Sequence, residues 1–255
     1  MQPNIVVIIA NRNYSKWIVK AVNSVRTQSY PLHKIQVVVA DDGSTDDSVE
    51  RLKTHFQFLN PDEKDLPIVH ILELDENQAI GRRLGRGPSY ARNRAIEYAK
   101  TNCHPDAIMI LDADDEYLED KIRISVEEWM KKPDFIGVVY SDYYIVDNDG
   151  NIKEEFKPTF NYTELLKYNI VHSCSLISMD AINKCGVYDE SLRTCEDYDL
   201  WCRIGKYYVI KHIPQFLMNV RTTGLNSTYS VSPEIWNSNL MTVRKRYDKI
   251  LYSQN

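Results

Sequence analysis

The chain has 255 residues, of which 43% are hydrophobic and 26% charged, and its formal net charge is -5. These values are typical of a globular protein large enough to bury a full hydrophobic core. The acidic balance argues against nucleic-acid binding through bulk positive charge, so a chain of this kind that handles anionic substrates must concentrate its basic residues locally.

Two sequence features bear on the location of the chain. No uninterrupted apolar run approaches the ~20 residues of a membrane-spanning helix, and residues 1–14 lack the basic start and the cleavage region of a signal peptide. We therefore expect a cytoplasmic protein, with a peripheral contact to the inner face of a membrane as the alternative. The five cysteines show no CxxC spacing, which favours free thiols over disulfides or zinc.

Strands and helices are expected to alternate through residues 1–117. Runs of β-branched and aliphatic residues predict buried strands, and stretches with apolar residues at helical spacing predict the helices between them. The expected strands are 4–10, 35–40, 67–74 and 107–111, and the expected helices begin at Ser15, at Ser44 or Thr45, and at Ser89. Such alternation predicts a mainly parallel, doubly wound α/β sheet, in which ligands bind at the carboxyl ends of the strands.

Carboxylates directly follow two of these buried strands. Asp41 and Asp42 end the second strand, and Asp112, Asp114 and Asp115 end the fourth. Like charges this close repel one another and lose hydration in a closed site, so a divalent cation would neutralise the second group. Carboxylate ligands completed by water and substrate phosphate suit Mn2+ or Mg2+. The ordinary alternative is an acidic loop that caps the following helix.

Five arginines supply local positive charge near the same edge of the sheet: Arg82, Arg83, Arg86, Arg92 and Arg94. Guanidinium groups can bind a diphosphate through paired hydrogen bonds. For any one of the five, a solvated helix face is the ordinary alternative. The glycines of this segment form neither a GxGxxG pattern nor a P-loop, so dinucleotide binding or ATP hydrolysis of those kinds has no motif behind it.

The organisation changes after residue 118. We expect a helix to about residue 132, then a strand over 136–146 whose turn at 147–151 returns into 152–156, a β-meander added to the sheet. A short helix at 161–168, a strand at 171–178 and a helix in the second half of 185–205 should follow. The segment 233–252 predicts a final amphipathic helix whose inward face carries Ile235, Leu240, Val243, Tyr247 and Leu251. Packing against the domain is its expected role, and a dimer or membrane-surface contact is the alternative.

A second group of acids, Glu196, Asp197 and Asp199, begins the helix within 185–205. Acids at a helix N-terminus are ordinarily explained by the helix dipole. A two-part catalytic site, however, also needs a second acid far along the chain from a metal-binding one. One group would hold a leaving diphosphate through a cation, while the other removes a proton from an attacking hydroxyl.

Taken together, five segments in this order and at these separations resemble the GT-A-fold glycosyltransferases of family 2. They are IVVIIANRNY, VVVADDGSTDDS, SYARNRAIEYAK, MILDADDEY and GVYDESLRTCEDYDLWCRIG. The resemblance covers nearly all of residues 4–221. It implies a Rossmann-like, mainly parallel sheet flanked by helices, within one domain over 1–255. That domain would contain a nucleotide-binding half (1–117), an acceptor-binding half (118–232) and the C-terminal helix (233–255).

The reaction implied by the resemblance is an inverting, single-displacement transfer of a sugar from a nucleotide-sugar, with a UDP-sugar foremost. The sugar would be a hexosyl or N-acetylhexosaminyl unit, and the acceptor a hydroxyl of a glycan, a lipid-linked molecule or a protein, in cell-surface polysaccharide or glycan synthesis. Mn2+ or Mg2+ would assist departure of the diphosphate. No nucleic-acid partner is expected.

The resemblance also assigns roles to individual residues. The base pocket would be lined by Ala10, Asn11, Arg12 and Asn13, and the base and ribose would be held by Asp41 and Asp42. The donor would also meet Arg86, Arg92 and the DxD motif formed by Asp112, Ala113 and Asp114, of which Asp114, with help from Asp115, would bind the metal. The catalytic base would be Asp197 of the pair Glu196–Asp197.

The sequence departs from the family pattern at two places. Arg12 stands where relatives often carry an aromatic residue, so a guanidinium contact would replace stacking on the base, or the nucleotide would differ. Thr223 stands where many relatives carry a histidine near the metal or the phosphates. His172 and His212 are the substitutes to consider, although an ordinary place in a strand is the simpler explanation for each.

Two other functions compete with glycosyl transfer. A nucleotidyltransferase also places metal-binding acids after the strands of a nucleotide-binding sheet, but it would be expected to carry a glycine-rich loop after the first strand, where this chain has Asn11, Arg12 and Asn13. A nucleotide-sugar-binding module without catalysis is the non-enzymatic alternative. The presence of both Asp114 and Asp197 weakens it.

Overall fold

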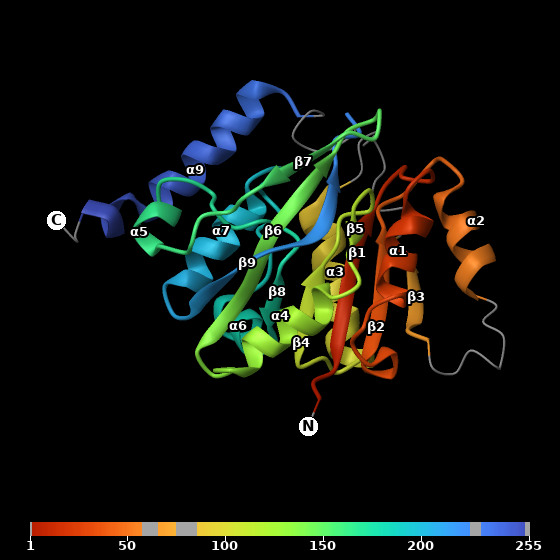
Figure 1. The fold of residues 1–255 in the computed structure, drawn as a ribbon. Helices are drawn as coiled ribbons and strands as arrows, with labels where there is room; N and C mark the ends of the chain where they lie inside the picture. The colour runs from red at the N-terminus through yellow and green to blue at the C-terminus, as the bar shows by residue number, and fades with distance from the viewer. Residues whose placement is uncertain (1, 58–65, 75–85, 225–230, 253–255) are drawn as a thin grey trace.

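The computed structural model describes residues 2–57, 66–74, 86–224 and 231–252 (Figure 1). The predictions made for Arg82 and Arg83 lie outside these residues, as does the one for the side chain of Leu251. All five cysteines lie within them and carry free thiols, as predicted.

Within the described residues, nine strands form one curled sheet in the order β3-β2-β1-β4-β8-β6-β9-β5, with β7 beside β6. The strands are β1 (Ile5–Asn11), β2 (Ile35–Asp41), β3 (Ile68–Glu73), β4 (Ala107–Ile110), β5 (Glu116–Tyr117), β6 (Ile136–Val146), β7 (Ile152–Glu155), β8 (Leu176–Ser178) and β9 (Val209–Arg221). The first four run parallel to one another, β1 lying between β2 and β4, which confirms the predicted parallel half.

The predicted β-meander is confirmed, whereas the predicted strand at 171–178 is too long. β6 and β7 pair antiparallel with Tyr143 opposite Glu155, and Gly150 takes a positive φ of 85° in the turn between them. β8 contains only the last three residues of its predicted range because the chain before it turns on itself. There the Ser175 hydroxyl donates to the carbonyl oxygen of His172 at 2.5 Å, and the Cys174 N–H donates to the His172 ring at 3.1 Å.

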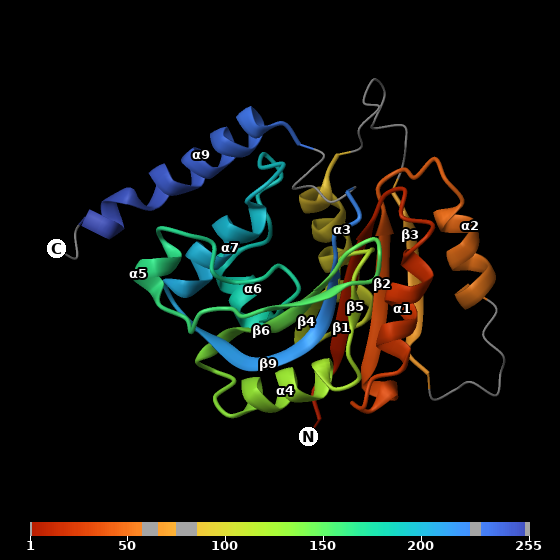
Figure 2. The same cartoon turned by 45° about the horizontal axis from the view of Figure 1, so that its top comes forward.

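Helices cover both faces of the sheet. They are α1 (Ile18–Arg26), the 3-10 turn η1 (Leu32–Lys34), α2 (Ser48–Leu52) with its π-helical continuation η2 (Lys53–Gln57), α3 (Pro88–Asn102), α4 (Lys121–Met130), α5 (Tyr162–Leu165), α6 (Met179–Cys185), α7 (Glu196–Gly205) and α9 (Pro233–Tyr252). Alternate residues of β1 feed two cores: Ile5, Val7 and Ile9 face α1, α2 and α4, while Val6 and Ile8 face α3, α6 and α7. Figure 2 shows α9 outermost, beyond α7 and α5.

Two predicted helix starts are wrong, each by about three residues. Ser15 does not cap α1: its N–H donates to Asp46 at 3.0 Å, and the helix begins at Ile18 after a turn. Neither Ser44 nor Thr45 begins α2, which starts at Ser48, because the Ser44 hydroxyl is bonded to Asp41 at 2.5 Å instead. In both cases a serine that could cap a helix instead forms a hydrogen bond within the loops that connect the strands to the helices.

The C-terminal helix has the predicted bounds, and the prediction of its inward face is wrong at one position. Val243 is fully buried and Leu240 and Tyr247 pack on the core, but Ile235 is 46% exposed. The neighbouring Trp236 packs there instead. The inward face of α9 is therefore rotated by one residue at its start.

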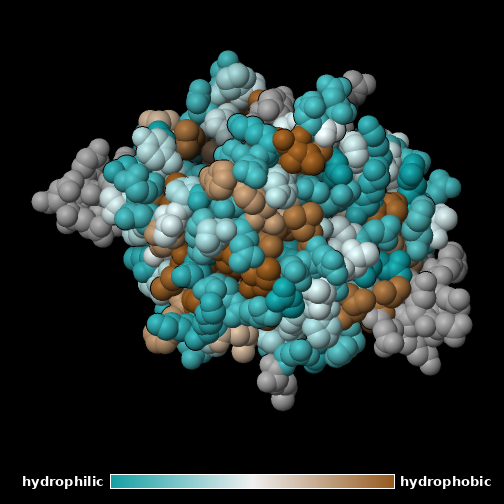
Figure 3. Space-filling view, in the orientation of Figure 1, coloured by the Kyte–Doolittle hydropathy of each residue, from teal (hydrophilic) through white to brown (hydrophobic). Residues whose placement is uncertain are grey.

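The surface carries no long apolar helix in the part of the chain that the structure describes. None of the described helices is both long and apolar enough to cross a bilayer. In the space-filling view, hydrophilic side chains dominate and apolar ones gather near the middle of the face, over β6 and β9 (Figure 3).

One buried lysine gives the fold a testable pH dependence. Lys121, the first residue of α4, is fully buried, and its Nζ donates to the Ser141 hydroxyl at 2.8 Å. Burial lowers the pKa of Lys121 to about 8. The unfolded chain, with an ordinary pKa, therefore binds more protons between pH 8 and about 10.5, so this group makes the folded state more stable as the pH rises through that window.

We expect the free energy of unfolding of Lys121→Met to fall relative to that of the unmodified protein as the pH rises from 8 to 10.5, by at most about 1.4 kcal/mol per pH unit. Urea titrations of both proteins at several pH values measure this difference, which also cancels the titration of the buried tyrosines. A difference that stays constant over the window would contradict a lowered pKa at Lys121.

Candidate active site

A cavity of about 460 Å³ opens where the ends of β1, β2 and β4 meet the starts of α3, α7 and α9. It brings together eleven of the residues predicted from the sequence as site residues: Ala10, Asn11, Arg12, Asp42, Arg92, Asp112, Ala113, Asp114, Asp115, Glu196 and Asp197. The acids after β2 and β4 and those at the start of α7 therefore share one space, as a two-part catalytic site requires.

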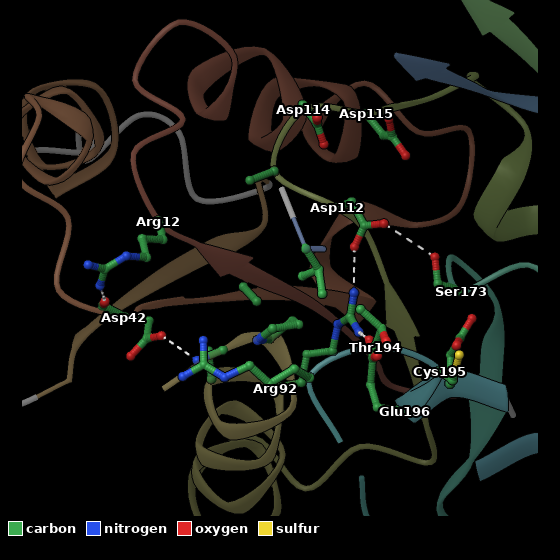
Figure 4. Close-up of a pocket in the computed structure, with 18 of the residues that line it drawn as sticks. Arg12, Asp42, Arg92, Asp112, Asp114, Asp115, Ser173, Thr194, Cys195 and Glu196 are labelled. Carbon is green, nitrogen blue, oxygen red and sulfur yellow. Dashed lines mark hydrogen bonds and ion pairs between the residues drawn. The ribbon is translucent and has the colours of Figure 1, made fainter. Parts of the chain in front are cut away.

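One end of the cavity is formed by Asp42 and Arg12. An Asp42 carboxylate oxygen accepts the N–H groups of Arg86 at 2.7 Å and Gly87 at 2.8 Å, which fixes the side chain at the entrance to α3. The Arg12 guanidinium donates to the carbonyl oxygens of Asp42 and Gly43 (Figure 4). Burial raises the pKa of Asp42. The Asp42 carboxylate and the Arg12 guanidinium thus lie side by side, and their acceptor and donor groups suit a polar heterocycle or a ribose.

Three predicted site residues do not line this cavity: Asn13, Asp41 and Arg86. The Asp41 carboxylate accepts from the Asn11 amide at 2.6 Å and from the Ser44 N–H at 2.8 Å. Asn13, in a left-handed conformation with φ of 59°, accepts the Thr45 N–H at 2.7 Å. The Arg86 guanidinium lies 4.5 Å from the centre of the Tyr90 ring. These residues shape the loops around Asp42, and their predicted contacts with a nucleotide stay predictions.

The loop after β4 carries the central acids. Asp112 is held by Arg92 at 2.7 Å and by the Ser173 hydroxyl at 3.2 Å. Asp114 and Asp115 project from the same loop on the side away from Arg92 (Figure 4). Asp114 accepts the Thr223 hydroxyl at 3.0 Å, and Asp115 accepts the Arg221 N–H at 2.8 Å. Thr223 thus contacts the central acid where the family pattern expects a histidine.

The charge of these acids is only partly balanced by the protein. Burial would raise the pKa of Asp112, but the Arg92 guanidinium lowers it below the usual range. Burial, together with the Asp112 charge, raises the pKa of Asp114 to about 6, and the same two causes raise the pKa of Asp115. The charged forms of Asp114 and Asp115 are therefore disfavoured in the protein alone, and a cation beside them would stabilise those forms.

These residues fit a divalent cation. Single ligand atoms of Asp112, Asp115 and Cys174 lie within 4.8 Å of one another, and Asp114 stands on the same loop. Carboxylate oxygens are the ligands that Mg2+ and Mn2+ prefer, whereas the Cys174 thiol is buried and its pKa is raised by burial, so it is a poor ligand. The carboxylate oxygens that the structure brings together for a cation are thus those of Asp112 and Asp115, and the predicted part of Asp114 in the metal site stays a prediction.

The start of α7 supplies the acids on the other side. The Glu196 carboxylate accepts from Arg92 at 2.6 Å, so one guanidinium bridges Asp112 and Glu196. The Asp197 carboxylate accepts one hydrogen bond from the Asn169 amide at 3.0 Å and another from the backbone N–H of Tyr198 at 2.7 Å. Burial raises the pKa of Glu196 to about 7 and also raises that of Asp197. A general base works best when its pKa lies near the working pH, and these raised values bring the pKa of each carboxyl closer to pH 7.

A strained residue sets the direction of these acids. Cys195, which precedes Glu196, adopts a left-handed conformation with φ of 62°, rare for a residue with a Cβ. The chain therefore turns sharply into α7. Strain of this kind often accompanies a functional site because the surrounding structure must hold it.

Of the two histidines considered, the structure brings one to the cavity. His172 lines it beside the Tyr143 ring, and burial lowers the pKa of His172 to about 3, so the ring is neutral. His212 does not line it and bonds to Asp142 at 2.8 Å.

The sequence did not predict several residues that line the cavity, among them Tyr14, Asn169, Ser173, Arg193, Thr194, Trp236 and Leu240. Arg193 and Thr194 could have been suspected, because they stand just before the acids of α7. Trp236 gave no signal of its own, because the inward face predicted for the final helix began with Ile235.

Known proteins resemble this chain in sequence. A family model described as Glycosyl transferase family 2 matches residues 5–186. An uncharacterized glycosyltransferase of Methanocaldococcus jannaschii is 30% identical over 228 residues, covering 86% of this chain and 71% of the relative. Chondroitin synthase of Escherichia coli is 26% identical, and the match covers 89% of this chain but only 30% of the synthase.

Solved structures share the arrangement of the sheet and helices. S. aureus TarS 1–349 in complex with UDP-GlcNAc superposes with a TM-score of 0.68 at 19% identity, covering 94% of this chain and 65% of that one. The mannosyltransferase PcManGT from Pyrobaculum calidifontis, in complex with GDP-Man and Mn2+, gives 0.66 at 18% identity over 97% of this chain and 70% of the other. The fold is that of the GT-A glycosyltransferases.

Proposed function

The chain belongs to glycosyl transferase family 2, and from that premise we propose that it transfers a sugar from a nucleotide-sugar to an acceptor hydroxyl with inversion at the anomeric carbon. The observation that supports this most is the shared cavity, which places Asp42, the acids after β4 and Asp197 around one space. A donor and an acceptor could therefore meet between two carboxylate groups with different surroundings.

The donor end would be built by residues from β1, β2 and α3. Asp42 would accept hydrogen bonds from the base or the ribose, and Arg12 would contact the base in place of an aromatic ring. Arg92 is 5% exposed and its two ion pairs hold Asp112 and Glu196 in place, while its predicted contact with the donor stays a prediction. Its charge still lies at the cavity wall, where a diphosphate would meet it at longer range.

Asp114 and Asp115 would hold the divalent cation, with Asp112 beside them. Such a cation, when bound, neutralises the diphosphate and so assists its departure. The chain's own contribution is to keep the two carboxylates oriented, through Thr223 on Asp114 and the Arg221 N–H on Asp115.

Asp197 would act as the general base. The acceptor hydroxyl oxygen forms a bond to the anomeric carbon as the bond from that carbon to the diphosphate oxygen breaks, and the hydroxyl proton passes to the Asp197 carboxylate. One displacement from the face opposite the leaving group inverts the configuration. Asn169 and the Tyr198 N–H hold the carboxylate in one orientation for this step.

The relatives support the substrate class. TarS was solved with UDP and UDP-GlcNAc, PcManGT with GDP-Man and Mn2+, and one relative is a chondroitin synthase. We propose a UDP-hexose or UDP-N-acetylhexosamine as donor, with Mn2+ or Mg2+, and a role in cell-surface polysaccharide synthesis. The cytoplasmic location, with or without a membrane contact, is part of this proposal.

The test is a panel of nucleotide-sugars incubated with the protein and Mn2+, read by released nucleoside diphosphate. Glycosyl transfer predicts release that rises when an acceptor is added. Pyrophosphate release from a nucleoside triphosphate and a sugar phosphate would instead identify a nucleotidyltransferase. Tight nucleotide-sugar binding without any turnover would identify a binding module.

Replacing Asp42 with alanine should weaken the binding of a nucleoside diphosphate by ~1–3 kcal/mol, the range for losing hydrogen bonds to a charged group. Isothermal calorimetry with UDP measures the change. Asp41→Ala is the matched comparison, since Asp41 lies next in the chain but does not line the cavity, and its carboxylate bonds to Asn11 and Ser44. Unchanged affinity in the Asp42 variant would move the nucleotide away from β2.

A further inference from the structure

The C-terminal helix forms part of the cavity wall. Trp236 and Leu240, one turn apart on α9, both line the cavity that contains Asp197. With Val243 and Tyr247 they form the face that packs toward α7. The helix therefore has a second role besides packing, because the first turn of that face extends beyond the core into the cavity.

This helix is fixed to the part of the chain that carries the acids. The Arg246 guanidinium pairs with Asp199 and with Asp189, each at 2.8 Å. Asp199 is 1% exposed and also pairs with Arg203 at 2.9 Å, so α9 is joined to a buried carboxylate in the first turn of α7. Because Asp199 is buried, its pairing with Arg246 resists displacement: moving α9 away would leave that buried carboxylate with one cation fewer.

A further contact ties α9 to the loop before α7. The Asn239 amide and the Thr194 hydroxyl are 3.0 Å apart. Thr194 precedes the left-handed Cys195, and Asp197 follows two residues later. Trp236 lies three residues before Asn239, on the same side of the helix, so the position of its ring relative to Asp197 is set by these contacts.

The cavity around Trp236 combines one aromatic surface with polar groups. Trp236 is only partly buried, so part of its ring is available to a ligand. Arg193, Asn169 and Asp197 supply hydrogen-bonding groups in the same cavity. An aromatic surface with a few polar groups is the lining that fixes the orientation of a small molecule having both an apolar and a polar side.

We propose that Trp236 is the acceptor platform of this enzyme, and that the acceptor is a carbohydrate. The C–H face of a pyranose ring would lie on the indole, while its hydroxyls reach Arg193 and Asn169 and the attacking hydroxyl reaches Asp197. A pyranose has this division between an apolar face and a polar rim in one ring, whereas a lipid chain lacks the hydroxyls and a serine side chain carries its hydroxyl without an apolar ring beside it. The proposal rests on the proposed function and narrows its acceptor.

The test compares Trp236→Ala and Trp236→Phe with the unmodified protein and with Ile235→Ala, a control in the adjacent, exposed position. The probes are p-nitrophenyl β-pyranosides of glucose, galactose, N-acetylglucosamine and N-acetylgalactosamine, a serine-containing peptide and a polyprenyl phosphate. Each is added to the nucleotide-sugar that the protein hydrolyses fastest. Nucleoside diphosphate release gives the acceptor KM and kcat, and release without acceptor gives donor hydrolysis.

We expect a pyranoside to stimulate release, and Trp236→Ala to raise its KM about tenfold or more, the loss of one good aromatic contact. Trp236→Phe should recover part of this affinity, and the Ile235→Ala control should keep both the acceptor KM and the donor hydrolysis of the unmodified protein. An unchanged acceptor KM in Trp236→Ala, or stimulation by the peptide or the polyprenyl phosphate alone, would overturn the carbohydrate platform. If the unmodified protein hydrolysed none of the nucleotide-sugars, the result would contradict the proposed function itself, and the acceptor platform, which depends on that function, would be contradicted with it.

Discussion

Asp114→Asn should leave the chain folded but lower sugar transfer at least ~100-fold, because stabilisation of a diphosphate leaving group by a cation is worth several kcal/mol. The carboxyl to amide change keeps the size of the side chain and its hydrogen bond with the Thr223 hydroxyl, while it removes the charge. Mn2+-dependent release of nucleoside diphosphate measures the effect, with a thermal melt on the same preparation.

Asp149→Asn is the matched control for this prediction. It makes the same chemical change in the exposed turn after β6, outside the cavity lining. Its transfer rate should equal that of the unmodified protein, and chelation of the metal should reproduce the loss seen in Asp114→Asn. Full activity in a chelator, or in Asp114→Asn itself, would show that the acids after β4 do not act through a cation.

Much of the N-terminal part of the fold was predictable because its signals are local. Buried β-branched and aliphatic runs identified β1, β2 and β4, and acids that follow such runs must lie at one edge of a parallel sheet. Asp42 and Asp114 were therefore expected at the same edge, and both line the cavity found there. The start of α2 was less predictable, since Ser44 has two possible partners, the helix or Asp41, and only the tertiary arrangement decides between them.

Contacts between distant segments were not predictable in this way. Arg92 lies in an arginine-rich segment that suggests phosphate binding, yet its guanidinium bonds to both Asp112 and Glu196. Glu196 is 104 positions away from Arg92 in the sequence. Likewise, helical periodicity identified most of the inward face of α9 but predicted Ile235 at the place where Trp236 packs, and it could not show that Trp236 reaches the cavity. A hydrophobic pattern gives the direction of a side chain within its helix and carries no information about what lies opposite.

The largest remaining effect is expected at the start of α7, where Asp197→Asn should lower turnover ~100- to 10,000-fold, the usual worth of a positioned general base. Donor binding should barely change, because the base acts on the acceptor hydroxyl in the transition state. Steady-state kinetics with a nucleotide-sugar and an acceptor measure turnover, and calorimetry with the nucleoside diphosphate measures donor binding.

The alternative for Asp197 is that it only stabilises its helix. The structure then limits which other acid could be the catalytic base. In that case Asp197→Asn should cost ~1 kcal/mol of stability with turnover nearly intact, seen as a lowered melting temperature in an active protein. Asp199 could not take over, since its carboxylate is buried between Arg203 and Arg246 and does not line the cavity. Glu196 would be the remaining acid, but its carboxylate is engaged by the Arg92 guanidinium at 2.6 Å, whereas Asp197 is held by the neutral Asn169 amide. If Asp197 is the base, Glu196→Gln should therefore retain more turnover than Asp197→Asn, and the reverse order would transfer the role to Glu196.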